Sequence, residues 1–203
     1  MNYYYITDEK AGVPLPEQVK LAVENGVKMI QYRRKSGSDE ERYKEVKEIK
    51  EICEDKALLI IDDRVDIAVL GEADGVHLGQ SDLPPSEVRK RYRDILIGVS
   101  THTLEQAEKA EKVADYVGIG PVHETGTKED TSDELEIQKA KQIADRIDLP
   151  TAAIGGIEEE DLSVLSESFD MICAISSVTR VGDLAENIRT FEEKIKEVKR
   201  KAR

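Results

Sequence analysis

Eight short runs of the chain are apolar almost throughout, and charged segments separate them. A strand that is apolar on both faces is typical of a parallel sheet with helices packed against both sides. We therefore predict eight parallel strands, at residues 3–7, 28–33, 57–61, 73–78, 95–100, 114–120, 150–156 and 169–176.

The segments between these runs repeat apolar positions with a helical period. In residues 39–51 and just beyond, for example, one face carries Tyr43, Val46, Ile49 and Ile52 and the other face is charged. Helices are predicted at residues 15–24, 39–51, 64–70, 85–92, 104–113, 135–147, 159–166 and 184–201.

Strand and helix alternate eight times within 203 residues, a length that suits one domain. This order predicts an α/β fold, a single (β/α)8 TIM barrel over residues 1–203, at the short end of that architecture's range. A doubly wound open sheet is the rival, but it usually has fewer strands and often a glycine-rich first turn. No GxGxxG follows the first strand here, so we expect the barrel.

Net charge limits the partners. The chain has 43 acidic and 30 basic side chains, a formal net charge of −13, whose field repels nucleic-acid phosphates and anionic membrane surfaces. We expect small-molecule substrates, and neither nucleic acid nor a membrane as a partner. An anionic substrate would need a local group of cations or a bound metal to overcome this field. The sequence leaves a homo-oligomer open.

Cysteine use and the first residues indicate the compartment. Cys53 and Cys173 are far apart and in no metal-binding or redox spacing, which favours two reduced thiols over a disulfide. Residues 1–10 lack a basic leader followed by an apolar segment, and no stretch approaches membrane-spanning length. We expect a cytoplasmic protein.

In a (β/α)8 barrel the chemistry gathers at the carboxyl ends of the strands, so polar residues there are the first candidates. The second strand runs into QYRRK, in which Gln31, Arg33 and Lys35 alternate and share one side of an extended chain. Two cations beside an amide suit an anion, although an ordinary basic loop would show the same pattern.

Carboxylates follow the third and fourth strands. Asp62 and Asp63 can simply cap the next helix, and an isolated histidine such as His77 is more often a core residue than a ligand. Asp63 and Asp82, however, follow adjacent strands, so their carboxylates should lie close together at the barrel mouth. Two carboxylates with room for water suit Mg²⁺, especially where substrate phosphate oxygens complete the shell.

A second group of residues suits phosphate. After the sixth strand, Thr125, Thr127 and Lys128 offer hydroxyls and an ammonium on a glycine-containing loop. The seventh strand ends in Gly155 and Gly156, and this segment and the end of the eighth strand supply backbone N–H groups where many barrel enzymes bind phosphate. Two anion sites in one mouth predict two phosphorylated partners, or one that is phosphorylated at both ends.

The order of these motifs resembles that of the thiamine phosphate synthases. The resemblance spans nearly the whole chain and is carried by QYRRK, DDRVDIA, ADGVHLGQSD, GVSTH, GPVHETGTKED and AIGGI. It implies a (β/α)8 barrel that joins hydroxymethylpyrimidine diphosphate to thiazole phosphate and releases pyrophosphate with Mg²⁺ bound. The implied chemistry is dissociative: the diphosphate leaves first and the thiazole nitrogen traps a pyrimidine-stabilised cation, so no side-chain nucleophile is needed.

The resemblance also implies roles for single residues. The pyrimidine diphosphate would meet Gln31, Arg33, Lys35, Asp62, His77, Ser100 and Lys128. Catalysis would come from the charge-stabilising groups Arg33, Lys35, Ser100 and Lys128. Mg²⁺ would be held by Asp63 and Asp82, and the thiazole phosphate by Thr125, Thr127, Gly156 and the backbone of Ile172 and Cys173.

The chain departs from the family pattern at four places. Asp62 stands where the family usually has Asn, so a negative charge replaces a hydrogen-bond donor near the diphosphate and could weaken substrate affinity or attract a further cation. Cys173 stands where Ser is common, and His123 replaces a usual aromatic residue. The glycine usual in the loop after TGTK is missing near Gln138.

Two other functions stay open. The thiazole tautomerases, relatives of the synthases, isomerise thiazole phosphate with a histidine in a nearby loop, and a neutral imidazole at His123 could shuttle a proton in this way. A tautomerase needs no diphosphate-binding residues, however, and Asp63, Asp82 and Lys128 are all present. A ligand-sensing barrel, with catalysis disabled by Asp62, is the third candidate. We expect the synthase.

Overall fold

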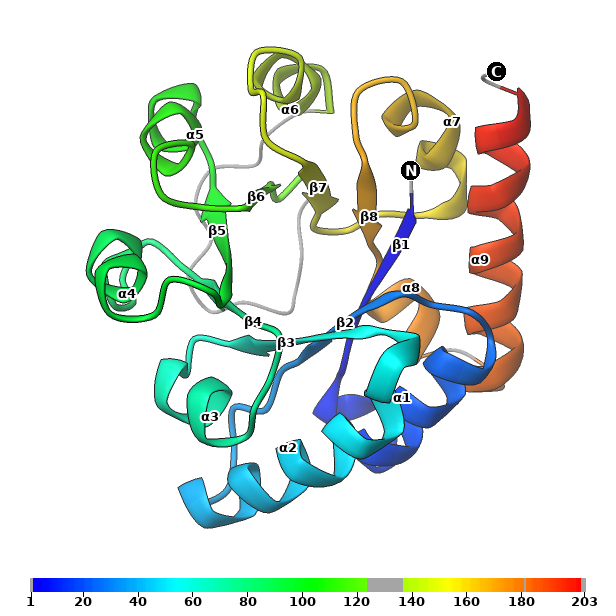
Figure 1. The fold of residues 1–203 in the computed structure, drawn as a ribbon. Helices are drawn as coiled ribbons and strands as arrows, with labels where there is room; N and C mark the ends of the chain where they lie inside the picture. The colour runs from blue at the N-terminus through cyan, green and yellow to red at the C-terminus, as the bar shows by residue number, and fades with distance from the viewer. Residues whose placement is uncertain (1, 124–136, 181, 202–203) are drawn as a thin grey trace.

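The computed structural model describes residues 2–123, 137–180 and 182–201, and in these ranges eight parallel strands close into a barrel in chain order (Figure 1). β1 pairs with both β2 and β8, which completes the ring. The strands are β1 (Asn2–Ile6), β2 (Met29–Tyr32), β3 (Leu58–Asp62), β4 (Gly75–Leu78), β5 (Leu96–Thr101), β6 (Tyr116–Ile119), β7 (Thr151–Ile154) and β8 (Met171–Cys173). The predicted (β/α)8 fold is confirmed.

Helices surround the barrel, as Figure 1 shows. They are α1 (Leu15–Glu24), α2 (Asp39–Cys53), α3 (Val65–Leu70), α4 (Pro85–Arg91), α5 (Leu104–Ala110), α6 (Ile137–Ala144), α7 (Leu162–Leu165), α8 (Ser176–Thr179) and α9 (Leu184–Lys201). Short 3-10 turns lie at η1 (Glu9–Ala11), η2 (Glu54–Lys56) and η3 (Glu159–Asp161). The sequence analysis missed α8, because it extended the eighth strand to residue 176, whereas β8 ends at Cys173.

Local sequence explains where the helices begin. At the start of α2, the backbone N–H of Glu41 donates to Ser38 Oγ at 3.2 Å, and Ser38 N donates back to Glu41 Oε2 at 2.8 Å. This capping box satisfies backbone donors that the first helical turn leaves free. Val46 and Ile49 of α2 are buried as predicted, but Tyr43, predicted on the same face, is exposed.

Alternation along the strands divides the apolar residues into two layers. In β1, Tyr3 and Tyr5 join the larger layer between barrel and helices, whereas Tyr4 and Ile6 point into the barrel. The interior layer also holds Ile60, Tyr116, Ala152, Met171 and Cys173. Layers of inward side chains make such a barrel a packed core with its open mouth at one end.

Both cysteines are free and buried, in agreement with the prediction of two reduced thiols. Cys53 lies in the outer layer and Cys173 in the interior layer. In the part of the chain that the structure describes, no helix has the length and apolar character needed to cross a membrane.

Candidate functional site

Lys35 links the predicted cation group to the predicted carboxylates. Its Nζ donates to Asp62 Oδ2 at 2.7 Å and to Asp63 Oδ2 at 2.5 Å. Arg33 Nε lies 3.6 Å from the same Asp62 oxygen. Because β2 and β3 are neighbours, their carboxyl ends bring these four side chains together. The cations and carboxylates that the sequence placed in separate motifs therefore lie against one another at the mouth.

The three carboxylates of this cluster crowd one another. Burial and the charge of Asp63 raise the pKa of Asp62, against the pull of Lys35. Burial raises the pKa of Asp82, and so does the neighbouring Asp63, although the Gly79 N–H donates to the Asp82 carboxylate. Burial acts in the same sense on Asp63, but Lys35 and Asp82 outweigh it and lower the pKa of Asp63. Such a pair titrates as a unit.

The turn after β3 holds Asp63 in an unusual backbone conformation. Its φ is +60°, a left-handed value that aspartate tolerates better than most residues. Its N–H donates to the His77 carbonyl at 2.8 Å, which ties this turn to β4. The N-cap of α3 is Arg64, whose side chain makes no capping hydrogen bond, and the carboxylates of Asp62 and Asp63 bond to Lys35.

A chain of hydrogen bonds crosses the barrel interior below the mouth. Gln31 Nε2 donates to Tyr4 Oη at 2.9 Å, and Tyr4 Oη lies 2.7 Å from Tyr116 Oη. His77 then bridges two hydroxyls, with Nδ1 3.0 Å from Tyr116 Oη and Nε2 2.9 Å from Ser100 Oγ. The chain thus joins three residues predicted to bind substrate, on β2, β4 and β5.

The sequence analysis missed the two tyrosines of this chain. The alternation of side chains along YYYIT could have indicated Tyr4. It points Tyr4 into the barrel and so places a hydroxyl in the apolar interior layer, where it needs a hydrogen-bond partner. A Cβ at Gly98 would overlap both Tyr116 and His77, so the glycine in β5 is what allows the phenol and the imidazole to meet.

The predicted phosphate site is described in part. Gly155 and Gly156 follow β7 with φ of +99° and +66°. A Cβ at Gly155 would press on Pro121, so glycine permits the close approach of the loops after β6 and β7. Outside the described residues lie Thr125, Thr127 and Lys128.

The end of β8 is built into the sheet. Ile172 pairs with Ala153 and Cys173 with Ile154 of β7. The Ile172 side chain belongs to the outer layer and that of Cys173 to the interior, where burial raises its pKa above the range of a reactive thiol. The thiol is therefore a packing group, and only the backbone here is left to meet a ligand.

His123 lies near the same loops. Its N–H donates to the Gly155 carbonyl at 3.1 Å, and its Nε2 lies 3.0 Å from Asp161 Oδ2. The same Asp161 oxygen accepts the Glu158 N–H at 2.9 Å. A carboxylate beside an imidazole fixes the orientation of the ring, which is a feature of proton-transferring histidines.

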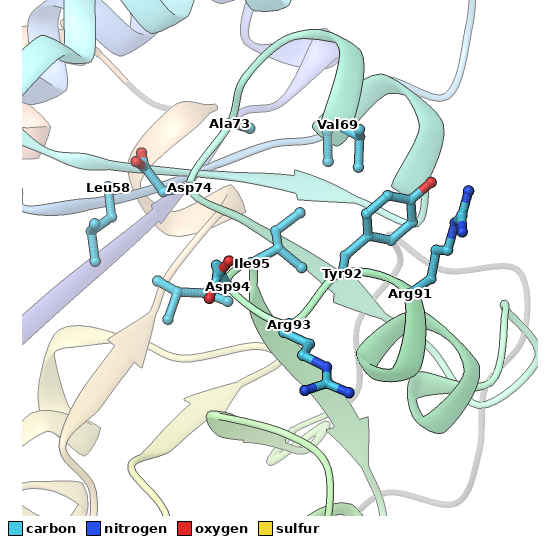
Figure 2. A pocket seen from close by; sticks show the side chains of 11 residues that line it. Leu58, Val69, Ala73, Asp74, Arg91, Tyr92, Arg93, Asp94 and Ile95 are labelled. Carbon is cyan, nitrogen blue, oxygen red and sulfur yellow. The ribbon is translucent and has the colours of Figure 1, made fainter.

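A hollow of about 640 Å³ lies at the opposite end of the barrel, where β3 and β5 begin. Figure 2 shows Leu58, Asp74, Tyr92 and Ile95 around it. Asp74 is used by the fold, because its carboxylate accepts the Leu59 N–H at 2.8 Å. Chemistry in this fold occurs at the carboxyl ends of strands, so we assign the site to the mouth and not to this hollow.

The donor set at the mouth is small. Within residues 2–123, 137–180 and 182–201, no three His, Cys, Asp or Glu side chains are grouped to hold a metal ion. Asp63 and Asp82 offer two carboxylates, so the remaining ligands of a divalent ion would come from water and substrate oxygens, as is usual for Mg²⁺.

Comparison with known proteins identifies the family. The model of the thiamine monophosphate synthase family matches residues 3–178. The chain is 38% identical to the thiamine-phosphate synthase of Methanosarcina barkeri, over 98% of this chain and 93% of that one. It is 43% identical to that of Caldicellulosiruptor bescii, over 91% and 86%. The solved thiamine phosphate pyrophosphorylase from Pyrococcus furiosus is 33% identical, with a TM-score of 0.89 over 97% of this chain and 96% of that chain. The chain therefore belongs to the thiamine monophosphate synthase family.

Proposed function

We propose that this protein is a thiamine phosphate synthase, a transferase that couples hydroxymethylpyrimidine diphosphate with thiazole phosphate and releases pyrophosphate. The observation that carries the proposal is the cluster of Lys35, Asp62 and Asp63 beside Asp82 at the carboxyl ends of the strands, in a chain of this family. Its substrates are small phosphorylated molecules, which do not cross membranes unaided, so we place the reaction in the cytoplasm.

We propose Mg²⁺ as the cofactor, held by Asp63 and Asp82. The two carboxylates act on each other electrostatically, and the pKa of Asp63 is lowered while that of Asp82 is raised, as in a pair that shares one proton or one cation. Their hard oxygen atoms suit Mg²⁺. When bound, the ion would neutralise charge on the diphosphate oxygens.

The cations of the mouth would receive the leaving group. Lys35 and Arg33 would exchange their contacts with Asp62 for the diphosphate, and Ser100 would donate to it from the opposite side. These charges stabilise the negative charge that grows as the bond to the methylene carbon breaks. Lys128 is assigned to the same task on its motif alone. Asp62 opposes the approach of the anion, which makes Lys35 more important here.

The second substrate would be aligned from the other side of the mouth. We assign its phosphate to the backbone of Gly156, where φ is positive, and to the backbone of Ile172 and Cys173 in β8. Thr125 and Thr127 are assigned to the same phosphate on their motif alone. Holding the thiazole nitrogen beside the reacting carbon turns an encounter of two molecules into a step within one complex.

The test is a coupling assay with both phosphorylated substrates, each substrate alone, and each mixture with and without Mg²⁺. We expect thiamine phosphate and pyrophosphate to form in equal amounts only when both substrates and Mg²⁺ are present. Tight binding of either substrate without any turnover would instead identify a ligand-sensing barrel.

The contact between His123 and Asp161 favours one alternative, a thiazole tautomerase. A synthase does not need this imidazole, so the variant His123→Ala should keep its coupling rate within about twofold. If isomerisation of thiazole phosphate is the sole activity, and His123→Ala abolishes it, the tautomerase is the correct function.

A further inference from the structure

We propose that Tyr4 and Tyr116 are positioning residues that hold His77 as its Nε2–H tautomer and so turn the Ser100 hydroxyl proton toward the barrel mouth. The inference deepens the proposed function and rests on it for the anion that Ser100 meets. It concerns the hydrogen-bonded chain from Gln31 to Ser100, which gives the two tyrosines a role in addition to packing.

The amide of Gln31 sets the direction of the chain. Its Nε2 can only donate, and it donates to Tyr4 Oη at 2.9 Å. The single proton of Tyr4 is then directed to Tyr116 Oη at 2.7 Å. This leaves the Tyr116 proton for His77 Nδ1, which lies 3.0 Å from Tyr116 Oη. A neutral imidazole whose Nδ1 accepts a hydrogen bond carries its proton on Nε2.

The tautomer decides what Ser100 offers to a ligand. With the proton on Nε2, His77 donates to Ser100 Oγ at 2.9 Å, and the serine proton is left for a group in the mouth. With the opposite tautomer, Ser100 would donate to His77 and present only lone pairs outward. A diphosphate oxygen is attracted in the first case and repelled in the second.

The side chains that carry these hydrogen bonds are sheltered from water. The exposed fractions are 1% for Tyr4, 3% for Gln31, 4% for Tyr116 and 8% for His77. Burial raises the pKa of both tyrosines, so their hydroxyls keep their protons and can donate. Hydrogen bonds in a buried chain polarise one another in one direction, so the orientation at Gln31 is transmitted to Ser100.

Ring ¹⁵N chemical shifts of His77 in the substrate-free protein test the proposal. The protein has three histidines, so few ring signals need to be assigned. Spectra at about pH 8.5, above the usual histidine pKa of about 6.5, distinguish the two neutral tautomers. We expect His77 as Nε2–H. The wild-type spectrum needs no variant, and an Nδ1–H ring there would overturn the proposal.

Two variants and a matched control sharpen this test. Gln31→Glu replaces the donor by a carboxylate that can only accept, so every bond of the chain should reverse and His77 should become Nδ1–H. Tyr116→Phe should leave a mixture of both tautomers. The control Tyr5→Phe removes another buried hydroxyl of β1, bonded to Gln18 at 3.0 Å, and should leave the His77 signals unchanged. His77 signals identical to wild type in Tyr116→Phe would contradict the proposal.

Kinetics separate positioning from simple packing. Tyr116→Phe should lower kcat for coupling about tenfold, the effect of one misdirected hydrogen bond, with KM for thiazole phosphate unchanged. Tyr5→Phe should retain wild-type kcat. If the wild type shows the Nε2–H tautomer but no coupling, the proposed function fails while the tautomer assignment stands. If coupling occurs and both phenylalanine variants retain wild-type kcat, the positioning role fails.

Discussion

Two sets of aspartates lie at opposite ends of the barrel, and they have different surroundings. At the amino ends, one aspartate precedes each of β4, β6 and β8, and its carboxylate accepts a backbone N–H near the start of the preceding strand. The three bonds are Asp74 to Leu59 at 2.8 Å, Asp115 to Ile97 at 2.7 Å and Asp170 to Thr151 at 2.9 Å. These carboxylates therefore satisfy backbone N–H groups where the strands begin.

At the carboxyl ends, the carboxylates of Asp62 and Asp63 bond to Lys35, and that of Asp82 accepts the Gly79 N–H just after β4. Asp115 and Asp74 each have a cation of their own, Arg89 and Lys50, whereas Asp62 and Asp63 share Lys35, with Arg33 also 3.6 Å from Asp62. A carboxylate without its own partner is costly unless something else binds it. In this pair of sets, the aspartates that precede strands have a structural role, and those that follow β3 and β4 are the ones we assign to a ligand.

The largest effect should come from the mouth. Asp63→Asn keeps the side-chain shape and tolerates the left-handed backbone, but removes a charged ligand of the proposed Mg²⁺. We expect turnover to fall on the order of 100-fold and the Mg²⁺ concentration needed for half-maximal rate to rise. Initial rates across a Mg²⁺ series measure both. A metal requirement equal to that of wild type would contradict the assignment of Asp63 as a ligand.

At the amino ends of the strands, replacing an aspartate should lower stability and leave turnover nearly unchanged. Asp115→Ala deletes the partner of the Ile97 N–H and of Arg89, so the free energy of unfolding should fall by about 2 kcal/mol. Denaturant unfolding measures this loss. The folded variant should turn over within about twofold of wild type. A folded variant with strongly reduced turnover would show that the two ends are not separate in function.

A smaller effect is expected at a third kind of carboxylate. Glu192 of α9 has one oxygen without a hydrogen-bond partner among the described residues, and burial raises its pKa although Lys196 acts to lower it. Below the unfolded pKa, about 4.3, both states hold the proton and no penalty arises; as pH rises toward and through the folded pKa, stability is lost.

Glu192→Gln stays neutral and should avoid this loss. We expect its free energy of unfolding to exceed that of wild type by about 1 kcal/mol at about pH 7.5, and by less at about pH 4. Denaturant unfolding at the two pH values provides the comparison. An equal difference at both values would show that ionisation of Glu192 is not the cause.

The fold could be predicted from the sequence because the apolar patterns of strands and of helices both follow from how each element is buried. Strands covered on both faces are apolar throughout, and helices on the surface repeat apolar residues on the one face that packs against the barrel. The order of strands and helices could therefore be read from the positions of the apolar residues. The proximity of Lys35, Asp63 and Asp82 could also be expected, since neighbouring strands end side by side at one rim.

Other parts of the site depend on three-dimensional fit. Tyr4 and Tyr116 are separated by 112 positions and meet only across the barrel interior, where Gly98 leaves room. The bond between Lys35 and Asp62 depends on side-chain rotamers that periodicity does not specify. Tyr43 was placed on the buried face of α2 by its spacing, yet its side chain is exposed while Val46 and Ile49 on the same face are buried, and the spacing alone does not show where along a helix the cover begins.

The most direct test of the central claim is calorimetric titration of pyrophosphate into the wild-type protein with and without Mg²⁺. If Asp63 and Asp82 hold the ion beside Lys35 and Arg33, Mg²⁺ should tighten pyrophosphate binding at least about tenfold, and Asp63→Asn should lose most of this gain. Equal pyrophosphate affinity with and without Mg²⁺ in the wild type would contradict the account.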